Sequence, residues 1–351
     1  MTPLIHMPID AIAKPEGPPL VEMRGLKTHF FTDDGVVKAV EGVDLDVYAN
    51  RTLCILGESG CGKSIMARSI LRIVDAPGRI VEGSIIYRAE DGRTVNLAEA
   101  RPGSKALREV RGQDIAMIFQ EPMSSLGPIT KIGKQIIEAL LLHRNMSKAE
   151  AKEAAIEMLV KVGIPKPAER FEAYPFELSG GMRQRAMIAM ALSCQPRLLI
   201  ADEPTTALDV TTQAQILDLI AELQEELSMG VMLITHDLGV VAEVAEDVAV
   251  MYMGRVVEKG DVYSIFENPQ HPYTQALLES VPHIGGTRRA RLPAIRGMVP
   301  HPLARPSGCP FRTRCDHVIA GVCDVTEPEL QKVGDSAVAC HLHSTTEAAD
   351  V

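Results

Sequence analysis

Short runs of apolar residues alternate along the chain with longer stretches in which apolar residues recur every three or four positions. Four of the short runs lie at residues 53–56, 115–119, 198–201 and 231–235. Uninterrupted apolar runs of this length are typical of strands buried on both faces of a parallel sheet. Over residues 133–162 the spacing predicts helix, ended by Gly163-Ile164-Pro165. This alternation predicts an α/β fold with a parallel sheet.

The pattern changes near residue 282, where prolines and arginines replace the periodic apolar positions. A chain of 351 residues is long enough for one large domain and an appendage. We therefore expect a flexible lead-in over 1–20, a main domain over 21–281 and a C-terminal extension over 282–351. The lead-in is rich in proline and lacks the basic and apolar regions of a signal peptide, which indicates a cytosolic chain.

Charge and hydropathy exclude two classes of protein. The formal net charge of −10 argues against a nucleic-acid-binding protein, whose surface is usually basic. No run approaches the ~18 to 20 consecutive apolar residues that a membrane-spanning helix needs. Seven cysteines in a cytosolic chain do not indicate a disulfide framework.

The apolar run at 53–56 leads into a complete phosphate-binding pattern, G-x-x-x-x-G-K-[ST]. The pattern is Gly57-Glu58-Ser59-Gly60-Cys61-Gly62-Lys63-Ser64, and Ile65 follows it. Its glycines let backbone N–H groups surround the α- and β-phosphates, and a helix starting near Lys63 adds its positive end. We expect Lys63 to reach the β- and γ-phosphates and Ser64 to bind Mg²⁺. A strand before the loop and a helix after it favour a nucleotide site over a chance match.

The other three runs also end in polar residues. These are Gln120 after 115–119, Asp202-Glu203 after 198–201 and His236 after 231–235. Parallel α/β sheets bind ligands at the carboxyl ends of their strands, so these side chains are expected to converge on the nucleotide. We expect Asp202 to anchor the Mg²⁺ site and Glu203 to orient or deprotonate the attacking water. Gln120 can bind the metal or the water, and His236 can bond to the γ-phosphate.

One further segment identifies a family. The run Leu178-Ser179-Gly180-Gly181-Met182-Arg183-Gln184-Arg185 resembles the signature of the ABC transporter ATPases. It predicts a helix N-terminus with a free Ser179 hydroxyl, suited to grip a γ-phosphate. The resemblance implies a P-loop NTPase fold of the ABC type in which the signature binds the ATP of a partner subunit. Each chain then supplies two half-sites.

The remaining elements of the family follow in order over roughly residues 21–278. The resemblance makes Gln120 the Q-loop residue, Glu203 the catalytic glutamate, Thr206-Ala207-Leu208-Asp209 the D-loop and His236 the switch histidine. By spacing, Phe30 falls where the family stacks an aromatic ring on adenine, with Phe31 beside it as the other candidate. Residues 121–185 correspond to the helical subdomain that contacts the membrane subunits.

Two segments narrow the resemblance to one subfamily. The run Glu121-Pro122-Met123-Ser124-Ser125-Leu126-Gly127-Pro128 looks like a motif of peptide-importer subunits, with Gly127 where asparagine is usual. The run Asn268-Pro269-Gln270-His271-Pro272-Tyr273-Thr274-Gln275-Ala276-Leu277-Leu278 resembles an element of the oligopeptide, dipeptide and nickel importers. Residues 292–297 and 308–311 are similar to the C-terminal extension of the same subfamily.

The extension also holds four cysteines, Cys309, Cys315, Cys323 and Cys340, in the spacing C-x5-C-x7-C-x16-C. Four thiols in a small, loop-rich module are best explained by a metal. The resemblance implies a [4Fe-4S] cluster, and tetrahedral Zn²⁺ is the alternative. Four unlinked reduced thiols also fit the sequence. A mixed site with His317, His341 or His343 stays open as well.

The sequence therefore predicts the ATP-binding and ATP-hydrolysing subunit of a bacterial ABC importer for peptides, with ATP and Mg²⁺ as cofactors. The resemblance implies a heterodimer with a second ATPase subunit, two membrane permeases and an extracytoplasmic solute-binding protein. The chain would then be peripheral, at the cytoplasmic face of the plasma membrane. An importer for nickel or another non-peptide solute is the alternative, followed by an exporter or a non-transport ABC ATPase. A repair ATPase is disfavoured because no long coiled coil fits between the phosphate loop and the signature.

Overall fold

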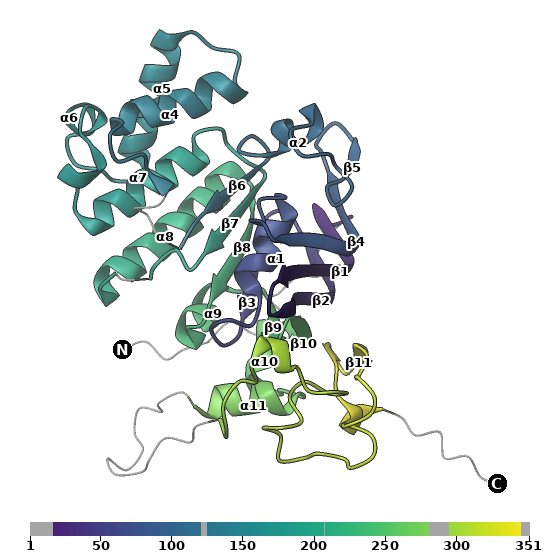
Figure 1. The fold of residues 1–351 in the computed structure, drawn as a ribbon. Helices are drawn as coiled ribbons and strands as arrows, with labels where there is room; N and C mark the ends of the chain where they lie inside the picture. Colours follow the sequence, from purple (N-terminus) through teal and green to yellow (C-terminus); the bar gives the residue numbers. More distant parts are fainter. Residues whose placement is uncertain (1–16, 121–124, 207, 281–294, 345–351) are drawn as a thin grey trace.

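The computed structural model describes residues 17–120, 125–206, 208–280 and 295–344, shown in Figure 1. Its larger sheet has eight strands in the order β11-β12-β10-β9-β3-β8-β7-β6. These strands are β3 (Thr52–Leu56), β6 (Ile115–Ile118), β7 (Leu198–Asp202), β8 (Gly230–Thr235), β9 (Asp247–Tyr252), β10 (Arg255–Asp261), β11 (Gln331–Val333) and β12 (Ser336–Val338). From β6 to β9 the strands are parallel, whereas β10, β12 and β11 are antiparallel to their neighbours. The four apolar runs are confirmed as β3, β6, β7 and β8, each to within one residue at either end.

A second, antiparallel sheet was not anticipated from the sequence. It has the strand order β2-β1-β4-β5, with β1 (Val21–Thr32), β2 (Gly35–Val47), β4 (Gly78–Arg88) and β5 (Thr94–Asn96). The pairing of β1 with β2 shifts register between Met23 and Leu26 and again between Thr28 and His29. Such bulges break the strict alternation by which half-buried strands are recognised.

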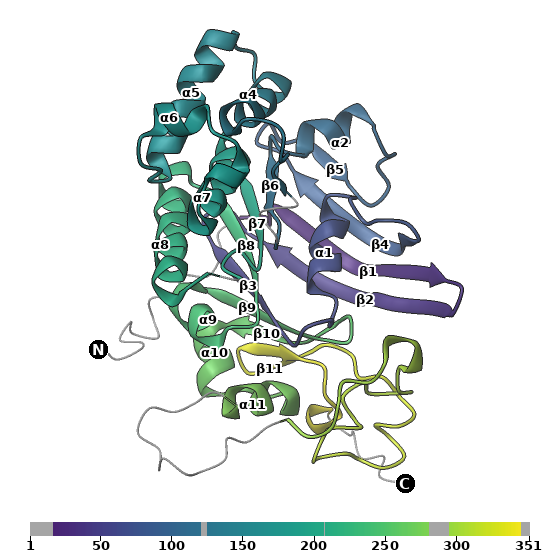
Figure 2. The same cartoon turned by 60° about the vertical axis from the view of Figure 1, so that its left-hand side comes forward.

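The helices are spread unevenly over the molecule. Four of them, α4 to α7, gather at the end of the molecule beyond β6 and β7 in both Figure 1 and Figure 2. The α-helices are α1 (Lys63–Ile70), α2 (Lys105–Val110), α4 (Ile132–His143), α5 (Lys148–Lys161), α6 (Pro167–Phe171), α7 (Gly180–Leu192), α8 (Val210–Leu227), α9 (Leu238–Val244), α10 (Val262–Glu267) and α11 (Pro272–Glu279), and short 3-10 turns are η2 (Pro175–Glu177), η3 (Pro302–Ala304) and η4 (His341–His343). No helix in the described part of the chain is both long enough and apolar enough to cross a bilayer.

The helical stretch expected over 133–162 is two helices, α4 and α5. Ser147 starts the second helix: its side chain accepts the N–H of Glu150, and the Glu150 carboxylate accepts the N–H of Ser147. This reciprocal capping box stabilises a new N-terminus inside an otherwise periodic pattern. The periodicity predicted helix correctly, but it did not reveal that the helix is interrupted at residues 144–147.

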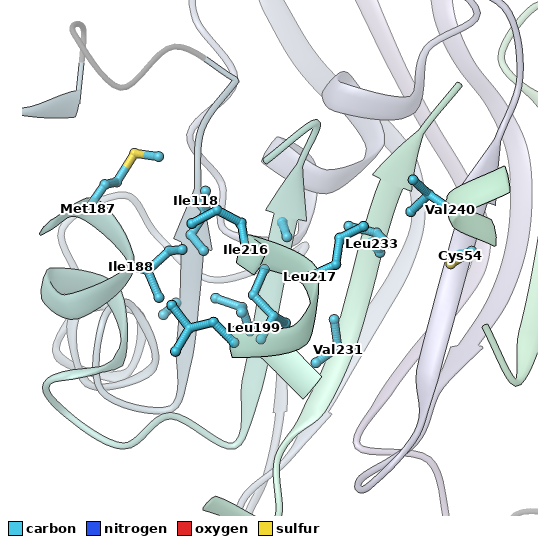
Figure 3. Close-up of a cluster of buried hydrophobic side chains, with 14 of the residues drawn as sticks. Cys54, Ile118, Met187, Ile188, Leu199, Ile216, Leu217, Val231, Leu233 and Val240 are labelled. Atoms are coloured by element: carbon cyan, nitrogen blue, oxygen red, sulfur yellow. The ribbon is translucent and has the colours of Figure 1, made fainter. Parts of the chain in front are cut away.

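The parallel strands are buried on both faces. Leu199 of β7 packs with Ile216 and Leu217 of α8 in one core cluster, as Figure 3 shows. Its neighbours Leu198 and Ile200 belong to a second cluster, together with α1 and the antiparallel sheet. Successive residues of one strand therefore serve different cores, which explains the uninterrupted apolar runs. The carboxyl ends of these strands are left to carry the polar residues.

The C-terminal extension is joined to the main sheet. Strand β12 pairs antiparallel with β10, where Val338 lies opposite Glu258, and β11 continues the sheet beyond it. In Figure 2 the extension packs below β9 and β10, next to α11. This joint brings residues 295–344 close to the phosphate loop, which follows β3.

Candidate functional site

The phosphate loop connects β3 to α1 in a conformation that depends on glycine. Gly57 and Gly62 have φ angles of 154° and 102°. A side chain at Gly62 would place its Cβ 2.1 Å from the carbonyl oxygen of Ala39, and one at Gly57 would place it 2.3 Å from that of Met251. Lys63 is buried and folds back over the loop, so that its Nζ donates to the carbonyl oxygens of Gly57 at 2.6 Å and Glu58 at 3.1 Å. Two carbonyl groups of the loop thus accept hydrogen bonds from the loop's own lysine.

Ser64 and Asp202 meet across the sheet. The Ser64 hydroxyl, on the first turn of α1, donates to Oδ1 of Asp202 at 2.9 Å. Asp202 ends β7 and is 1% exposed, and this burial raises its pKa although the bond from Ser64 opposes the shift. A hydroxyl beside a buried carboxylate provides the hard oxygen ligands that Mg²⁺ prefers. The donor set here fits the predicted Mg²⁺ site.

Glu203 lies at the centre of the site. Its Oε2 accepts hydrogen bonds from Nε2 of Gln120 at 2.9 Å and from Oγ1 of Thr206 at 3.0 Å, and its Oε1 lies 3.3 Å from Nδ1 of His236. The residue has a φ angle of 47°, in the left-handed region, and its backbone N–H donates to the carbonyl oxygen of Ile234 in β8. The structure thus brings together the three strand-end residues that the sequence singled out.

A cavity of about 290 Å³ opens over these groups. Every predicted nucleotide-binding residue from Ser59 to Ile65 lines it, and so do Gln120 and Glu203. Its remaining lining residues are Val37, Lys38, Ala39, Met253, Gly254, Val299, Pro300, Pro302 and Arg305. The last four come from the C-terminal extension, and no pattern in the sequence pointed to them. The cavity is large enough to hold phosphate groups beside the loop.

The two aromatic candidates do not line this cavity. The ring of Phe30 packs against Gly78, whose added Cβ would lie 2.6 Å from it. Phe31 is 39% exposed and carries the Arg79 guanidinium over its ring at 4.2 Å. The adenine contact stays a prediction for either residue.

The signature segment begins α7, as predicted, but its serine is already bonded. The Ser179 hydroxyl accepts the N–H of Met182 at 3.3 Å and so caps the helix, which corrects the expectation of a free hydroxyl. A capping hydroxyl keeps its own proton available for donation. Ser179 and Gly180 are exposed and lie outside the cavity lining, while buried Gln184 donates to the carbonyl oxygen of Pro204. The signature helix is therefore tied to the segment after Glu203, with its first residues facing solvent.

The D-loop segment leads into α8. Asp209 caps this helix, since its carboxylate accepts from the N–H of Thr212 at 3.0 Å and from its hydroxyl at 2.7 Å. Thr206 contacts Glu203 as described above. Ala207 lies outside the described residues, as do residues 121–124 of the expected peptide-importer motif.

The four cysteines of the extension line one small cavity, together with His317 and His341. The N–H of His317 points to the sulfur of Cys315 at 3.3 Å, and burial raises the pKa of Cys309 to about 11. Among residues 17–120, 125–206, 208–280 and 295–344, no group of three or more potential ligands is close enough to hold a metal ion. The predicted iron–sulfur or zinc centre is thus not supported as a formed site, although the four thiols line the same cavity.

Two family models match the chain. The model described as ABC transporter matches residues 40–206, which contain the phosphate loop, Glu203 and the signature. The model described as the C-terminal region of oligopeptide/dipeptide transporters matches residues 257–323, which contain α11 and three of the four cysteines.

Curated relatives match over nearly the whole chain. The dipeptide transport ATP-binding protein DppD of Bacillus subtilis is 48% identical over 325 residues, covering 92% of this chain and 94% of that protein. DppD of Haemophilus influenzae is 46% identical over 322 residues, covering 92% and 95%. A Brucella melitensis protein named for peptide import and ATP binding is 51% identical over 321 residues, covering 90% and 94%.

Solved structures share the fold of the ATPase region. The ATP-binding cassette MJ0796, in a dimeric post-hydrolysis state bound to ADP and Pi, is 26% identical with a TM-score of 0.60, covering 69% of this chain and 98% of that chain. The cbiO1 protein of Clostridium perfringens, part of the ABC transporter complex cbiONQ, is 25% identical with a TM-score of 0.59, covering 72% and 92%. Each match spans nearly the whole of the other chain.

Proposed function

This chain belongs to the ABC transporter family of ATP-hydrolysing subunits, and we propose that it energises a bacterial importer for peptides. The observation that carries the proposal is the convergence of Gln120, Thr206 and His236 on Glu203, beside a cavity lined by the phosphate loop. A carboxylate held at this point can orient the water that attacks the γ-phosphate.

Each side chain of the site has a proposed part in hydrolysis. Lys63 exchanges its bonds to loop carbonyls for the β- and γ-phosphates, since those carbonyls are weaker partners than phosphate. Ser64 and Gln120 are the proposed Mg²⁺ ligands, and buried Asp202 holds the Ser64 hydroxyl in place. When bound, Mg²⁺ neutralises charge on the β- and γ-phosphates.

For Glu203, we propose that two of the present contacts are exchanged when nucleotide and water bind. Gln120 would be a ligand of Mg²⁺, and His236, whose side chain is 64% exposed, can turn to the γ-phosphate. Thr206 can keep its hydrogen bond to Glu203 and so hold the carboxylate in orientation.

The signature supports a composite site with a second subunit. Ser179 and Gly180 are exposed and lie outside this chain's own cavity, as expected of groups that bind a neighbour's ATP. The cassette MJ0796 has been solved as a dimer with hydrolysis products. We extend this to a heterodimer with a related ATPase, docked on two permeases at the cytoplasmic face of the membrane and served by an extracytoplasmic binding protein.

Peptides are favoured as the solute over nickel. The support is the match to the oligopeptide/dipeptide C-terminal region and the two DppD relatives, which are named for dipeptide transport. The test is the ATPase rate of the reconstituted complex with its binding protein, given a dipeptide or Ni²⁺. Stimulation by the dipeptide alone supports the proposal. Stimulation by Ni²⁺ alone selects the alternative.

We also propose that the cysteine cavity binds a [4Fe-4S] cluster, with Zn²⁺ as the alternative. The support is that four thiols separated by up to 31 positions in the sequence line one cavity. Protein purified without oxygen should then absorb near ~400 nm, as cysteine-ligated clusters do. Cys315→Ser should lose this absorbance, whereas Cys194→Ser, a buried thiol outside the cavity, should keep it. Zinc alone, or no metal with four alkylatable thiols, would reject the cluster.

A further inference from the structure

The C-terminal extension holds the phosphate loop directly. Arg314 donates two hydrogen bonds to Glu58, the second residue of the loop, at 2.6 Å to Oε2 and 3.0 Å to Oε1. This is the bidentate geometry of the strongest charge-assisted pairs. The Arg314 side chain is 3% exposed and that of Glu58 is 28% exposed, so solvent screens the pair only in part.

Other contacts fix the position of Arg314. Its Nε donates to the carbonyl oxygen of Arg296 at 2.9 Å, and its guanidinium lies 5.8 Å from the ring centroid of Tyr252 in β9. The rings of Tyr252, Tyr273 and Phe311 pack together with centroids 4.7 to 5.3 Å apart. The arginine is thus held by the extension and by the main sheet at the same time.

The same part of the loop has a second anchor. The backbone N–H of Glu58 donates to the hydroxyl of Tyr273, on α11, at 3.0 Å. The Glu58 carbonyl accepts from Lys63 Nζ. Arg314 and Tyr273 therefore fix the residue against which the phosphate-binding lysine rests.

The positive charge of Arg314 also offsets the negative charge of Glu58 next to the phosphate-binding site. The Glu58 carboxylate is part of a loop that receives a triphosphate, and unpaired it would repel that ligand. The bidentate guanidinium cancels this charge. Four other residues of the extension, Val299, Pro300, Pro302 and Arg305, line the nucleotide cavity itself.

We propose that Arg314 is a positioning residue of the nucleotide site, through which the C-terminal extension sets the affinity of the phosphate loop for ATP. The inference rests on the proposed function, because it takes the cavity as an ATP site. It gives the extension a role in ATP binding in addition to the residues of the ATPase region.

The test compares Mg-ATP binding by calorimetry in Arg314→Met, Glu58→Gln and the double variant. Arg314→Met should weaken ATP binding about tenfold, because a partly buried carboxylate is left unpaired beside the phosphates. In the Glu58→Gln background, which has no carboxylate to neutralise, the same substitution should change binding by less than about twofold. Arg312→Met is the matched control, since that guanidinium contacts Ser307 within the extension. It should bind ATP as the wild type does.

Two results overturn the inference. One is unchanged ATP affinity in folded Arg314→Met. The other is an equal loss with and without the Glu58 charge, which would mean that Arg314 supports only the fold. If Arg314→Met does not fold, Arg314→Lys keeps the charge without the fork geometry and should bind ATP about threefold more weakly. Wild-type protein that binds no ATP would instead reject the proposed function.

Discussion

Replacing Glu203 with glutamine removes the carboxylate charge and leaves the shape of the side chain unchanged. Glutamine can keep its oxygen where Gln120 and Thr206 donate and can turn its NH₂ toward Nδ1 of His236, which accepts in one neutral tautomer. All three contacts therefore survive, and we expect the stability and ATP affinity of the variant to match the wild type. Any loss of activity then reports on the chemistry.

The expected loss is large. A positioned general base contributes about 10² to 10⁴ in rate, equal to about 3 to 5 kcal/mol of the activation barrier. Phosphate release by the assembled transporter measures it, with Glu222→Gln on the exposed face of α8 as the control. ATP bound without turnover should also trap the closed pair of ATPase subunits. A Glu203→Gln rate within a few fold of the wild type would refute the role of this carboxylate.

Three further outcomes follow from the geometry. The isolated chain, shown to be monomeric by light scattering, should hydrolyse ATP far more slowly than the complex, because exposed Ser179 is proposed to bind a partner's nucleotide; an equal rate would contradict the composite site. Gly62→Ala should abolish nucleotide binding in an equilibrium titration, since its Cβ would lie 2.1 Å from the Ala39 carbonyl oxygen. Gly60→Ala should lose less binding, because its Cβ meets no atom within 4 Å and only its φ of 77° is strained for alanine. Ser147→Ala should lower the unfolding free energy by about 1 kcal/mol in urea through loss of the α5 cap, and no change in the midpoint would count against the capping box.

Site residues could be located from the sequence where polar residues directly follow a buried strand. The apolar run 198–201 is β7 to within one residue, and Asp202 and Glu203 lie at its end as expected. Local patterns carry this information because a parallel strand buried on both faces leaves its polar residues at the end. The phosphate loop was also recognisable from local sequence, because nearby backbone carbonyl groups leave no room for a side chain at Gly57 and Gly62.

The features that could not be predicted from the sequence depend on contacts between residues far apart in the chain. Arg314 and Glu58 are separated by 256 positions, and nothing beside either residue marks the pair. The antiparallel sheet was hidden by the bulges of β1, and the end of α4 by the periodicity that continues through residues 144–147. Tertiary packing decides these features, and periodicity does not report it.

The central claim is that ATP hydrolysis at Glu203 drives peptide import, and uptake of a labelled dipeptide into proteoliposomes tests it most directly. The vesicles hold the complete complex, with ATP inside and the binding protein outside. We predict uptake that needs enclosed ATP and is lost in Glu203→Gln but kept in Glu222→Gln. Uptake of the dipeptide without ATP, or equal uptake by the Glu203→Gln complex, would contradict the account.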